Sequence, residues 1–99
     1  MGTRDIFIER LAKGKVVEFK ACGHSMTGKI NHGEKITVSP DVSSLSSGDM
    51  VFCRVKGFQF VHLVTAVRGS QYQISNNRGK VNGWIGLNSI YGKVIGVQP

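Results

Sequence analysis

The chain has 99 residues, which is enough for a single hydrophobic core but not for two. Apolar residues make up 40% and charged residues 19%, a composition typical of globular proteins that excludes fibrous and disordered chains. No apolar run approaches the roughly 20 residues of a membrane-spanning helix, and the N-terminus lacks the apolar stretch of a secretory signal. We therefore expect one domain, residues 1–99, in the cytoplasm.

Charge is strongly unbalanced. Thirteen Lys and Arg residues against six Asp and Glu residues give a formal net charge of +7. A field of this sign attracts nucleic acids, nucleotides or acidic protein surfaces. The basic residues are scattered along the chain, which favours a solvated basic surface, and no recognisable nucleic-acid-binding module is present. Nucleic acid therefore remains one of the candidate partners.

The N-terminal segment predicts a short amphipathic helix over residues 3–14, followed by a β core over residues 15–99. Thr3 can cap this helix, and Gly14 suits its C-terminal stop. The spacing of Ile6, Phe7 and Leu11 gives one apolar stripe that must pack against another element.

From Lys15 onward the period of the apolar residues changes from that of a helix to that of a strand. The alternation in KVVEFKA places Val17, Phe19 and Ala21 on one face. Polar loops and turns are expected at residues 41–49 and 76–83, and one helical turn at residues 87–90. Further strands are expected at residues 35–38, 50–55, 58–67, 71–75 and 91–97. The predicted fold is mainly β, a curled antiparallel sheet or partly open barrel with one short N-terminal helix.

Lys56-Gly57 predicts a tight hairpin between two of these strands. In the predicted hairpin His62 lies on an apolar face. Burial there disfavours the imidazolium and leaves a neutral ring that can accept a proton. A single histidine on such a face is more often a core residue than a base. The pairing across the turn sets three pairs of residues opposite each other: Val55 and Phe58, Cys53 and Phe60, and Val51 and His62.

Cys22 and Cys53 are too few for a disulfide framework, and we interpret both as small core residues that stay reduced. No Cys or His spacing typical of metal sites occurs, so we expect no metal and no cofactor. The least supported alternative is a metal site built from Cys22, His24, His32, Cys53 and His62.

Several segments, in order, resemble the protease fold shared by type I signal peptidases and SOS-repressor autoproteases. The resemblance covers about Val17 to Val97. The segments are GHSM at residues 23–26, Ile30, Gly33, ITV at 36–38, LSSGDMV at 45–51, VHLV at 61–64 and IYGKV at 90–94.

The resemblance implies a nucleophile and a general base. In this fold a G-x-S-M segment carries the nucleophilic serine, which here is Ser25, and the base comes from a later strand. Bacterial enzymes place a lysine there, whereas endoplasmic-reticulum and archaeal-type signal peptidases place a histidine in a V-H-R segment, which VHLV resembles. The implied base is therefore His62, and the oxyanion would be bound by backbone amides of Ser25 and its neighbours.

The chain differs from the pattern of that fold at two places. Where S-M-x-P is usual, the sequence is Ser25-Met26-Thr27-Gly28. Where the histidine branch has a GDN…D segment to orient the base, the chain has only asparagines, since no aspartate follows Asp49. An asparagine can fix an imidazole ring but does not stabilise an imidazolium as a carboxylate does. The candidate orienting residues are Asn76, Asn77 and Asn82, of which Asn82 joins Ser25 and His62 in the candidate catalytic set; the same asparagines could simply shape a turn.

Two functions from different classes remain. The first is a stand-alone serine hydrolase that acts on a peptide bound in extended form. The second is a non-catalytic protein, of the kind found in phages and mobile elements, that uses the same cleft to bind a peptide, a partner protein or a small anionic ligand such as a nucleotide. Arg78 and Lys80 would offer charge, and Trp84 or Tyr91 a stacking surface, although a tryptophan beside a glycine more often fills a core. The candidate binding residues are Gly23, His24, Met26, Asn76, Asn77, Arg78 and Trp84.

Overall fold

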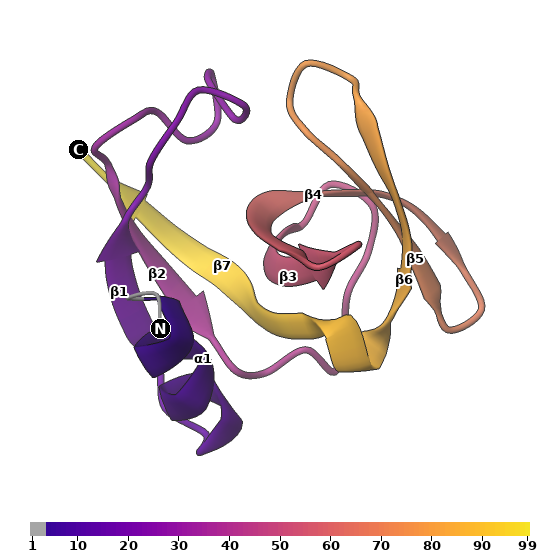
Figure 1. Ribbon diagram of the computed structural model, residues 1–99, viewed down its shortest axis with the longest axis horizontal. Helices are drawn as coiled ribbons and strands as arrows, with labels where there is room; N and C mark the ends of the chain where they lie inside the picture. The colour runs from indigo at the N-terminus through magenta and orange to yellow at the C-terminus, as the bar shows by residue number, and fades with distance from the viewer. Residues whose placement is uncertain (1–3) are drawn as a thin grey trace.

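A computed structural model describes residues 4–99, which form one antiparallel sheet of seven strands with a short helix at its edge (Figure 1). The strand order is β1-β2-β7-β3-β4-β5-β6. The predicted mainly β fold, a curled antiparallel sheet with one short helix, is confirmed. The elements are α1 (Arg4–Ala12), β1 (Val17–Lys20), β2 (Lys35–Ser39), β3 (Met50–Val55), β4 (Phe58–Arg68), β5 (Gln71–Ser75), β6 (Val81–Gly86), a 3-10 turn η1 (Leu87–Ser89) and β7 (Ile90–Gln98).

Helix α1 ends at Ala12, and Gly14, the predicted C-terminal stop, has a φ of +81°. The amide of Gly14 donates to the carbonyl of Leu11, and the amide of Lys15 to that of Arg10, which together form a Schellman cap. The predicted apolar stripe is partly wrong, because Ile6 is 50% exposed. Phe7 and Leu11 of the stripe do face the sheet, and the ring of Phe7 stacks on that of Phe19 with centroids 4.9 Å apart. The predicted cap Thr3 lies outside the described residues.

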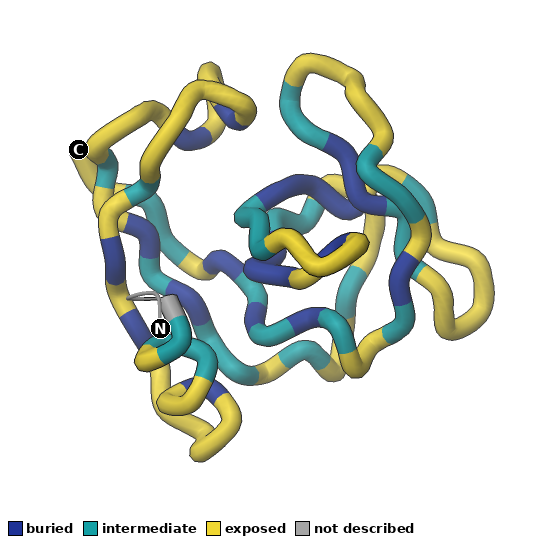
Figure 2. The backbone as a smooth tube through the Cα atoms, viewed as in Figure 1, coloured by how far each residue is buried: buried dark blue, intermediate teal, exposed yellow. Residues whose placement is uncertain are grey.

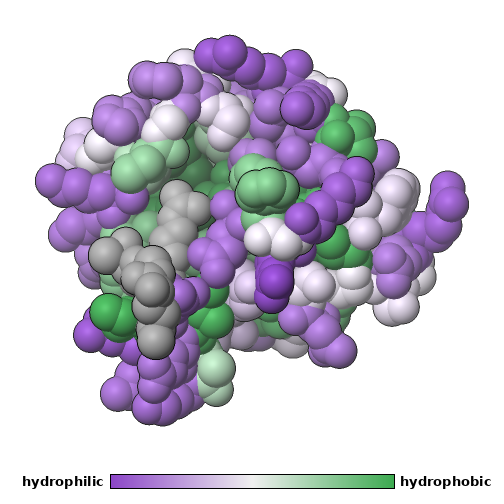
Figure 3. Space-filling model, viewed as in Figure 1, coloured by the Kyte–Doolittle hydropathy of each residue, from purple (hydrophilic) through white to green (hydrophobic). Residues whose placement is uncertain are grey.

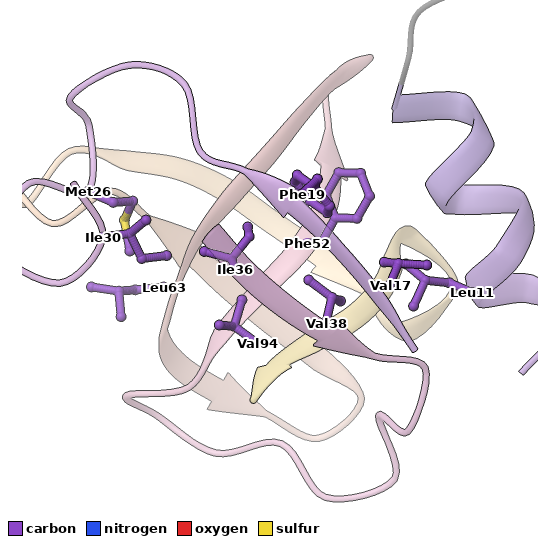
Figure 4. Close-up of a cluster of buried hydrophobic side chains, with 10 residues drawn as sticks. All are labelled: Leu11, Val17, Phe19, Met26, Ile30, Ile36, Val38, Phe52, Leu63 and Val94. Carbon is purple, nitrogen blue, oxygen red and sulfur yellow. The ribbon is translucent and has the colours of Figure 1, made fainter. Parts of the chain in front are cut away.

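The first half of the sheet, β1, β2 and β7, carries most of one hydrophobic cluster, which also includes Phe52 of β3 and Leu63 of β4 and against which α1 packs (Figure 4). In β1 the side chains alternate between buried and exposed, as the sequence predicts, with Val17 opposite Val38 and Phe19 opposite Ile36. Figure 4 shows Leu11 and Val17 at the helix end of this cluster and Met26 and Ile30 near Leu63 at the other end. The cluster thus reaches from the helix to the loop after β1.

The second half of the sheet begins with the β3–β4 hairpin, whose predicted register is found residue for residue. Lys56 and Gly57 have φ of +51° and +85°, the pair of positive values that a type I′ turn requires. This turn matches the right-handed twist of the strands and so fixes the register through local geometry. His62 therefore lies opposite Val51.

The predicted long turn at residues 76–83 is wrong in its second part, because β6 already begins at Val81. Asn82-Gly83 does not form a turn. Ile74 pairs with Gly83 and Ser75 with Val81, so Asn82 is the extra residue of a β-bulge. Gly83, with φ of +152°, supplies the backbone conformation of the bulge.

Strands β3 to β6 enclose a second hydrophobic cluster, because β6 curls back towards β3. A Cβ built on Gly83 would lie 3.3 Å from Cγ1 of Val55, which shows how close the two strands approach. Buried residues follow the strands and exposed residues the projecting loops (Figure 2). Hydrophilic side chains cover most of the face seen in Figure 3. Within residues 4–99 no helix is long and apolar enough to cross a membrane.

Candidate active site

The segment after β1 forms a compact turn that carries Ser25 on its exposed side. The amide of Thr27 donates to the carbonyl of His24, and the amide of Ile30 to that of Met26 at 2.8 Å. Met26 and Ile30 are only 5% and 3% exposed and belong to the first hydrophobic cluster. The turn is thus anchored by two apolar side chains, while Ser25, which directly precedes Met26, is exposed.

His62 is held in the middle of β4 and is 4% exposed. The ring of Phe60, two residues earlier on the same face, stacks on the imidazole with centroids 4.5 Å apart and an interplanar angle of 16°. On the neighbouring strand, the fully buried Val51 lies opposite His62. The imidazole is therefore fixed by packing on a regular strand.

The structure brings Ser25, His62 and Asn82 into one line of contacts. Oγ of Ser25 lies 3.0 Å from Nε2 of His62, within the range of roughly 3 to 4 Å expected for a serine and its base. On the other side of the ring, Nδ1 lies 2.7 Å from Oδ1 of Asn82. An amide oxygen only accepts hydrogen bonds, so Nδ1 carries the proton of the neutral ring. Nε2 is then unprotonated and accepts from the hydroxyl of Ser25.

Burial lowers the pKa of His62 below its ordinary value, because the imidazolium loses hydration. The hydrogen bond to Asn82 acts in the opposite direction and is the smaller effect. The ring is therefore neutral at neutral pH. Neutral imidazole is the form that can take a proton from a hydroxyl.

Asn82 reaches the histidine because it is the bulge residue of β6. An extra residue in one strand leaves its side chain outside the normal alternation and can re-aim it. Asn82 belongs to the predicted catalytic set, but the sequence pattern predicts a turn at this position. The signal for the bulge was Gly83, since an isolated glycine inside a strand pattern often marks one.

A cavity of about 240 Å³ opens beside Ser25 and His62. Polar and apolar groups both line it, and they come from the end of β1, the Ser25 turn and the first part of β4. Ligand pockets for whole drug-sized molecules are usually larger, roughly 300 to 1,000 Å³, so this volume suits a side chain or a short segment. The lining residues are Phe19, Ala21, Cys22, Gly23, Ser25, Met26, Ile30, Gln59, Phe60, Val61 and His62.

The predicted binding residues divide into two groups around this cavity. Gly23 and Met26 line it beside Ser25. His24 is exposed and does not line it; its ring lies 5.4 Å from that of His32. Sequence reasoning missed the contribution of β4, in particular Phe60, although the predicted hairpin already placed this ring on the face of His62.

Four other predicted binding residues come from the β5–β6 hairpin and do not line the cavity. Oδ1 of Asn76 accepts from the amides of Arg78 and Lys80 and so shapes the hairpin tip. Asn77 contacts the Ser25 turn. Arg78 is exposed. Trp84 does not fill a core, because it is 40% exposed, with the Arg68 guanidinium 5.3 Å from its ring centroid.

Tyr91, the other predicted stacking residue, does not line the cavity and contacts the ring of Phe52 in the first hydrophobic cluster, with centroids 5.1 Å apart. Among residues 4–99 no group of three or more His, Cys, Asp or Glu side chains could hold a metal ion. Cys53 is buried, which raises the pKa of its thiol to about 12. The interpretation of Cys22 as a core residue is wrong: it is exposed and borders the cavity, because β1 ends at Lys20.

Residues 4–95 match the family model of the Peptidase S24-like proteins. The match covers nearly the whole chain, so the protein belongs to this family. Membership confirms the resemblance to the SOS-repressor and signal peptidase fold and indicates a peptidase-related function. A comparison with curated proteins gave no match.

Proposed function

We propose that the chain is a serine hydrolase that cleaves a peptide bound in extended form. Ser25 is the nucleophile, His62 the general base and Asn82 the residue that orients the base. The observation that supports this most directly is the ordered set of contacts from Asn82 to His62 to Ser25 at the border of a cavity.

In the first half of the reaction, Oγ of Ser25 attacks the carbonyl carbon of the peptide bond. Its proton passes to Nε2 of His62, while Asn82 accepts the hydrogen bond from Nδ1. The carbonyl oxygen becomes an oxyanion that needs hydrogen-bond donors. The amides of Ser25 and Met26 donate to no other described residue and are the candidate donors.

In the second half, the tetrahedral intermediate collapses and the C–N bond breaks. The proton on His62 passes to the leaving amine, and the acyl group remains on Ser25. A water molecule then attacks the ester, gives its proton to His62 and releases the carboxylic acid, after which the serine regains its proton. The cycle consumes one water and needs no cofactor.

The substrate would bind as an added strand. β1 is an edge strand that pairs with β2, and residues 60–62 of β4 pair with β3, while the pairing of β4 with β5 begins only at Leu63. Both segments border the cavity. Main-chain hydrogen bonds to such edges give affinity for any extended peptide, and pockets for side chains give specificity.

A non-catalytic binding function is the alternative, and the amide at Asn82 favours it. An amide orients the ring but does not compensate the charge that develops on the imidazole, so catalysis loses much of its driving force. The same cleft would then hold a peptide, a partner protein or a small anionic ligand, to which a formal net charge of +7 contributes attraction.

The test is covalent labelling with a fluorophosphonate probe, followed by mass spectrometry of the labelled peptide. We expect the label on Ser25, none in Ser25→Ala, and a rate lower by about 10² or more in His62→Gln. Ser70→Ala, which removes an exposed serine from the turn between β4 and β5, is the matched control and should label normally.

Incubation with a mixture of unstructured peptides, with products identified by mass spectrometry, tests the substrate class. Cleavage by the wild type but not by Ser25→Ala supports a peptidase. A wild type that neither labels nor cleaves, and that retains a peptide or anionic ligand in native mass spectrometry, would favour the binding function.

A further inference from the structure

The tip of the β5–β6 hairpin reaches across to the Ser25 turn through a single residue, Asn77. Its backbone amide donates to the carbonyl of Ser25 at 3.0 Å, and Nδ2 of its side chain donates to the carbonyl of Thr27 at 2.8 Å. The two contacts join residues about 50 positions apart in the sequence and grip the turn on both sides of Met26. Both are made with backbone carbonyls, so they fix the path of the main chain.

The turn needs such support because of Gly28. This residue stands where the S-M-x-P pattern has proline, and its φ is +102°, a value that proline does not adopt. A Cβ at this position would lie 3.2 Å from Nδ2 of Asn77. The main chain and the asparagine therefore approach each other as closely as they do only because residue 28 is a glycine.

Bonds within the turn itself leave it dependent on outside contacts. Oγ1 of Thr27 donates to the carbonyl of His24, and the amide of Gly28 donates to Oδ1 of Asn31. Each of these bonds joins residues three positions apart, so neither of them ties the turn to another part of the molecule. Of the candidate hairpin asparagines, Asn76 makes its side-chain bonds within its own loop and does not reach the turn.

We propose that Asn77 is a positioning residue that holds Ser25 in register with its base and replaces the rigidity that a proline would give the turn. One hairpin then positions both partners: Asn82 orients His62, and Asn77 holds the backbone that carries Ser25. The inference rests on the proposed hydrolase function for its effect on rate. The clamp itself is a structural property that can be tested without catalysis.

The kinetic test uses the fluorophosphonate reaction, separated into the maximal rate of acylation and the probe concentration for half-saturation. Asn77→Ala removes the Nδ2 contact, and Asn77→Asp replaces the donor by an acceptor of the same shape. Both should lower the maximal rate by about tenfold or more, because small displacements of a nucleophile have large effects on rate. The half-saturating concentration and the pH dependence should not change, since Asn77 does not contact His62. Asn88→Ala, at an exposed site in η1, should behave as the wild type.

Amide hydrogen exchange tests the clamp independently of activity. In Asn77→Ala the amide of Ile30, which donates to Met26 within the turn, should exchange at least severalfold faster than in the wild type. The amide of Val64, which donates to Asp49, is the internal reference and should not change. Unchanged exchange at Ile30 would overturn the clamp, and unchanged acylation with faster exchange would overturn its role in positioning. If the wild type itself does not label, the hydrolase function fails, and the exchange result decides whether the clamp exists.

Discussion

The proposed base and the proposed nucleophile of the candidate site are held by two unlike regions of the molecule. His62 lies on a regular strand, 4% exposed, with Phe60 stacked on its ring and Asn82 bonded to its far nitrogen. Ser25 lies on an exposed turn outside the sheet. This turn is anchored by the buried side chain of Met26 and by the hydrogen bonds that Asn77 donates.

The difference shows how this fold divides two requirements. A base must be dry enough to stay neutral, and packing on a strand supplies this. A nucleophile must be reachable by substrate, so its support has to come from backbone hydrogen bonds and from side chains beneath it. We call the surroundings of His62 the packed side of the site and the turn that carries Ser25 the exposed side. The packed side should therefore respond to changes of charge, and the exposed side to changes of backbone geometry and of access for the substrate.

The largest expected effect comes from Asn82→Asp on the packed side. A carboxylate at this position would stabilise the imidazolium that forms as Ser25 attacks, and should raise the acylation rate by about 10² or more. It would also raise the pKa of His62, so the pH at which labelling reaches half its plateau should move upward. Stopped-flow labelling across the pH range measures both effects.

Asn88→Asp is the control for this change, because it adds the same charge at an exposed site away from the cavity. It should alter neither the plateau rate nor the pH profile. An Asn82→Asp variant that labels no faster than the wild type would contradict the idea that the missing carboxylate limits the rate, even if its pH profile moved.

Access to the exposed side can be tested at Cys22. This thiol is exposed and borders the cavity next to Gly23, whereas Cys53 is fully buried and its pKa is raised to about 12. N-Ethylmaleimide should therefore modify Cys22 alone, since thiolates are the reacting species. The adduct would fill the cavity and slow fluorophosphonate labelling of Ser25, by about tenfold.

Cys22→Ser is the matched control, because it should label at the normal rate and become insensitive to the maleimide. Peptide mapping by mass spectrometry identifies the modified cysteine. Full labelling of Ser25 in the alkylated protein would show that the cavity is not the route by which the probe reaches the serine.

Sequence reasoning succeeded where local geometry decides the outcome. The Lys56-Gly57 turn sets the register of β3 and β4 by itself, so the position of His62 opposite Val51 could be predicted. The strand period in β1 likewise predicted which side chains are buried. In α1 the spacing placed Ile6 and Phe7 on the same apolar stripe, but only Phe7 faces the sheet, where it stacks on Phe19, while Ile6 is exposed.

The rest of the site depends on contacts between distant segments. Asn-Gly at residues 82–83 is an ordinary turn signal, and only the partner strand β5 makes it a bulge that points Asn82 at His62. The contact of Asn77 with Thr27 is likewise invisible in the sequence. The resemblance of the chain to a protease fold supplied the pairing of Ser25 with His62, which composition and periodicity alone did not predict.

A substitution that strains the backbone of the Ser25 turn should have a smaller effect, which is seen in the stability of the protein. Gly28→Ala must place a side chain at φ of +102° and 3.2 Å from Nδ2 of Asn77, and should lower the free energy of unfolding by about 2 kcal/mol. Gly69→Ala, at φ of +58° with open space around it, should cost only about 1 kcal/mol. Urea denaturation measures both. Equal costs would mean that the approach of Asn77 adds nothing to the strain of the turn.

The smallest effect is the dependence of stability on pH that arises from His62. Its pKa is lowered in the folded state by burial, so below about pH 6.5 the unfolded chain binds a proton that the folded chain resists. The free energy of unfolding is therefore fully retained above that pH and falls as the pH drops through the interval between the two pKa values. His62→Gln should reduce this loss, because glutamine does not titrate.

Urea denaturation of both proteins at about pH 7.5 and pH 5.5 gives the comparison, since groups other than His62 contribute equally to each. An identical loss in both proteins would mean that the packed side does not keep the imidazole neutral, and the distinction between a dry base and an accessible nucleophile would no longer hold.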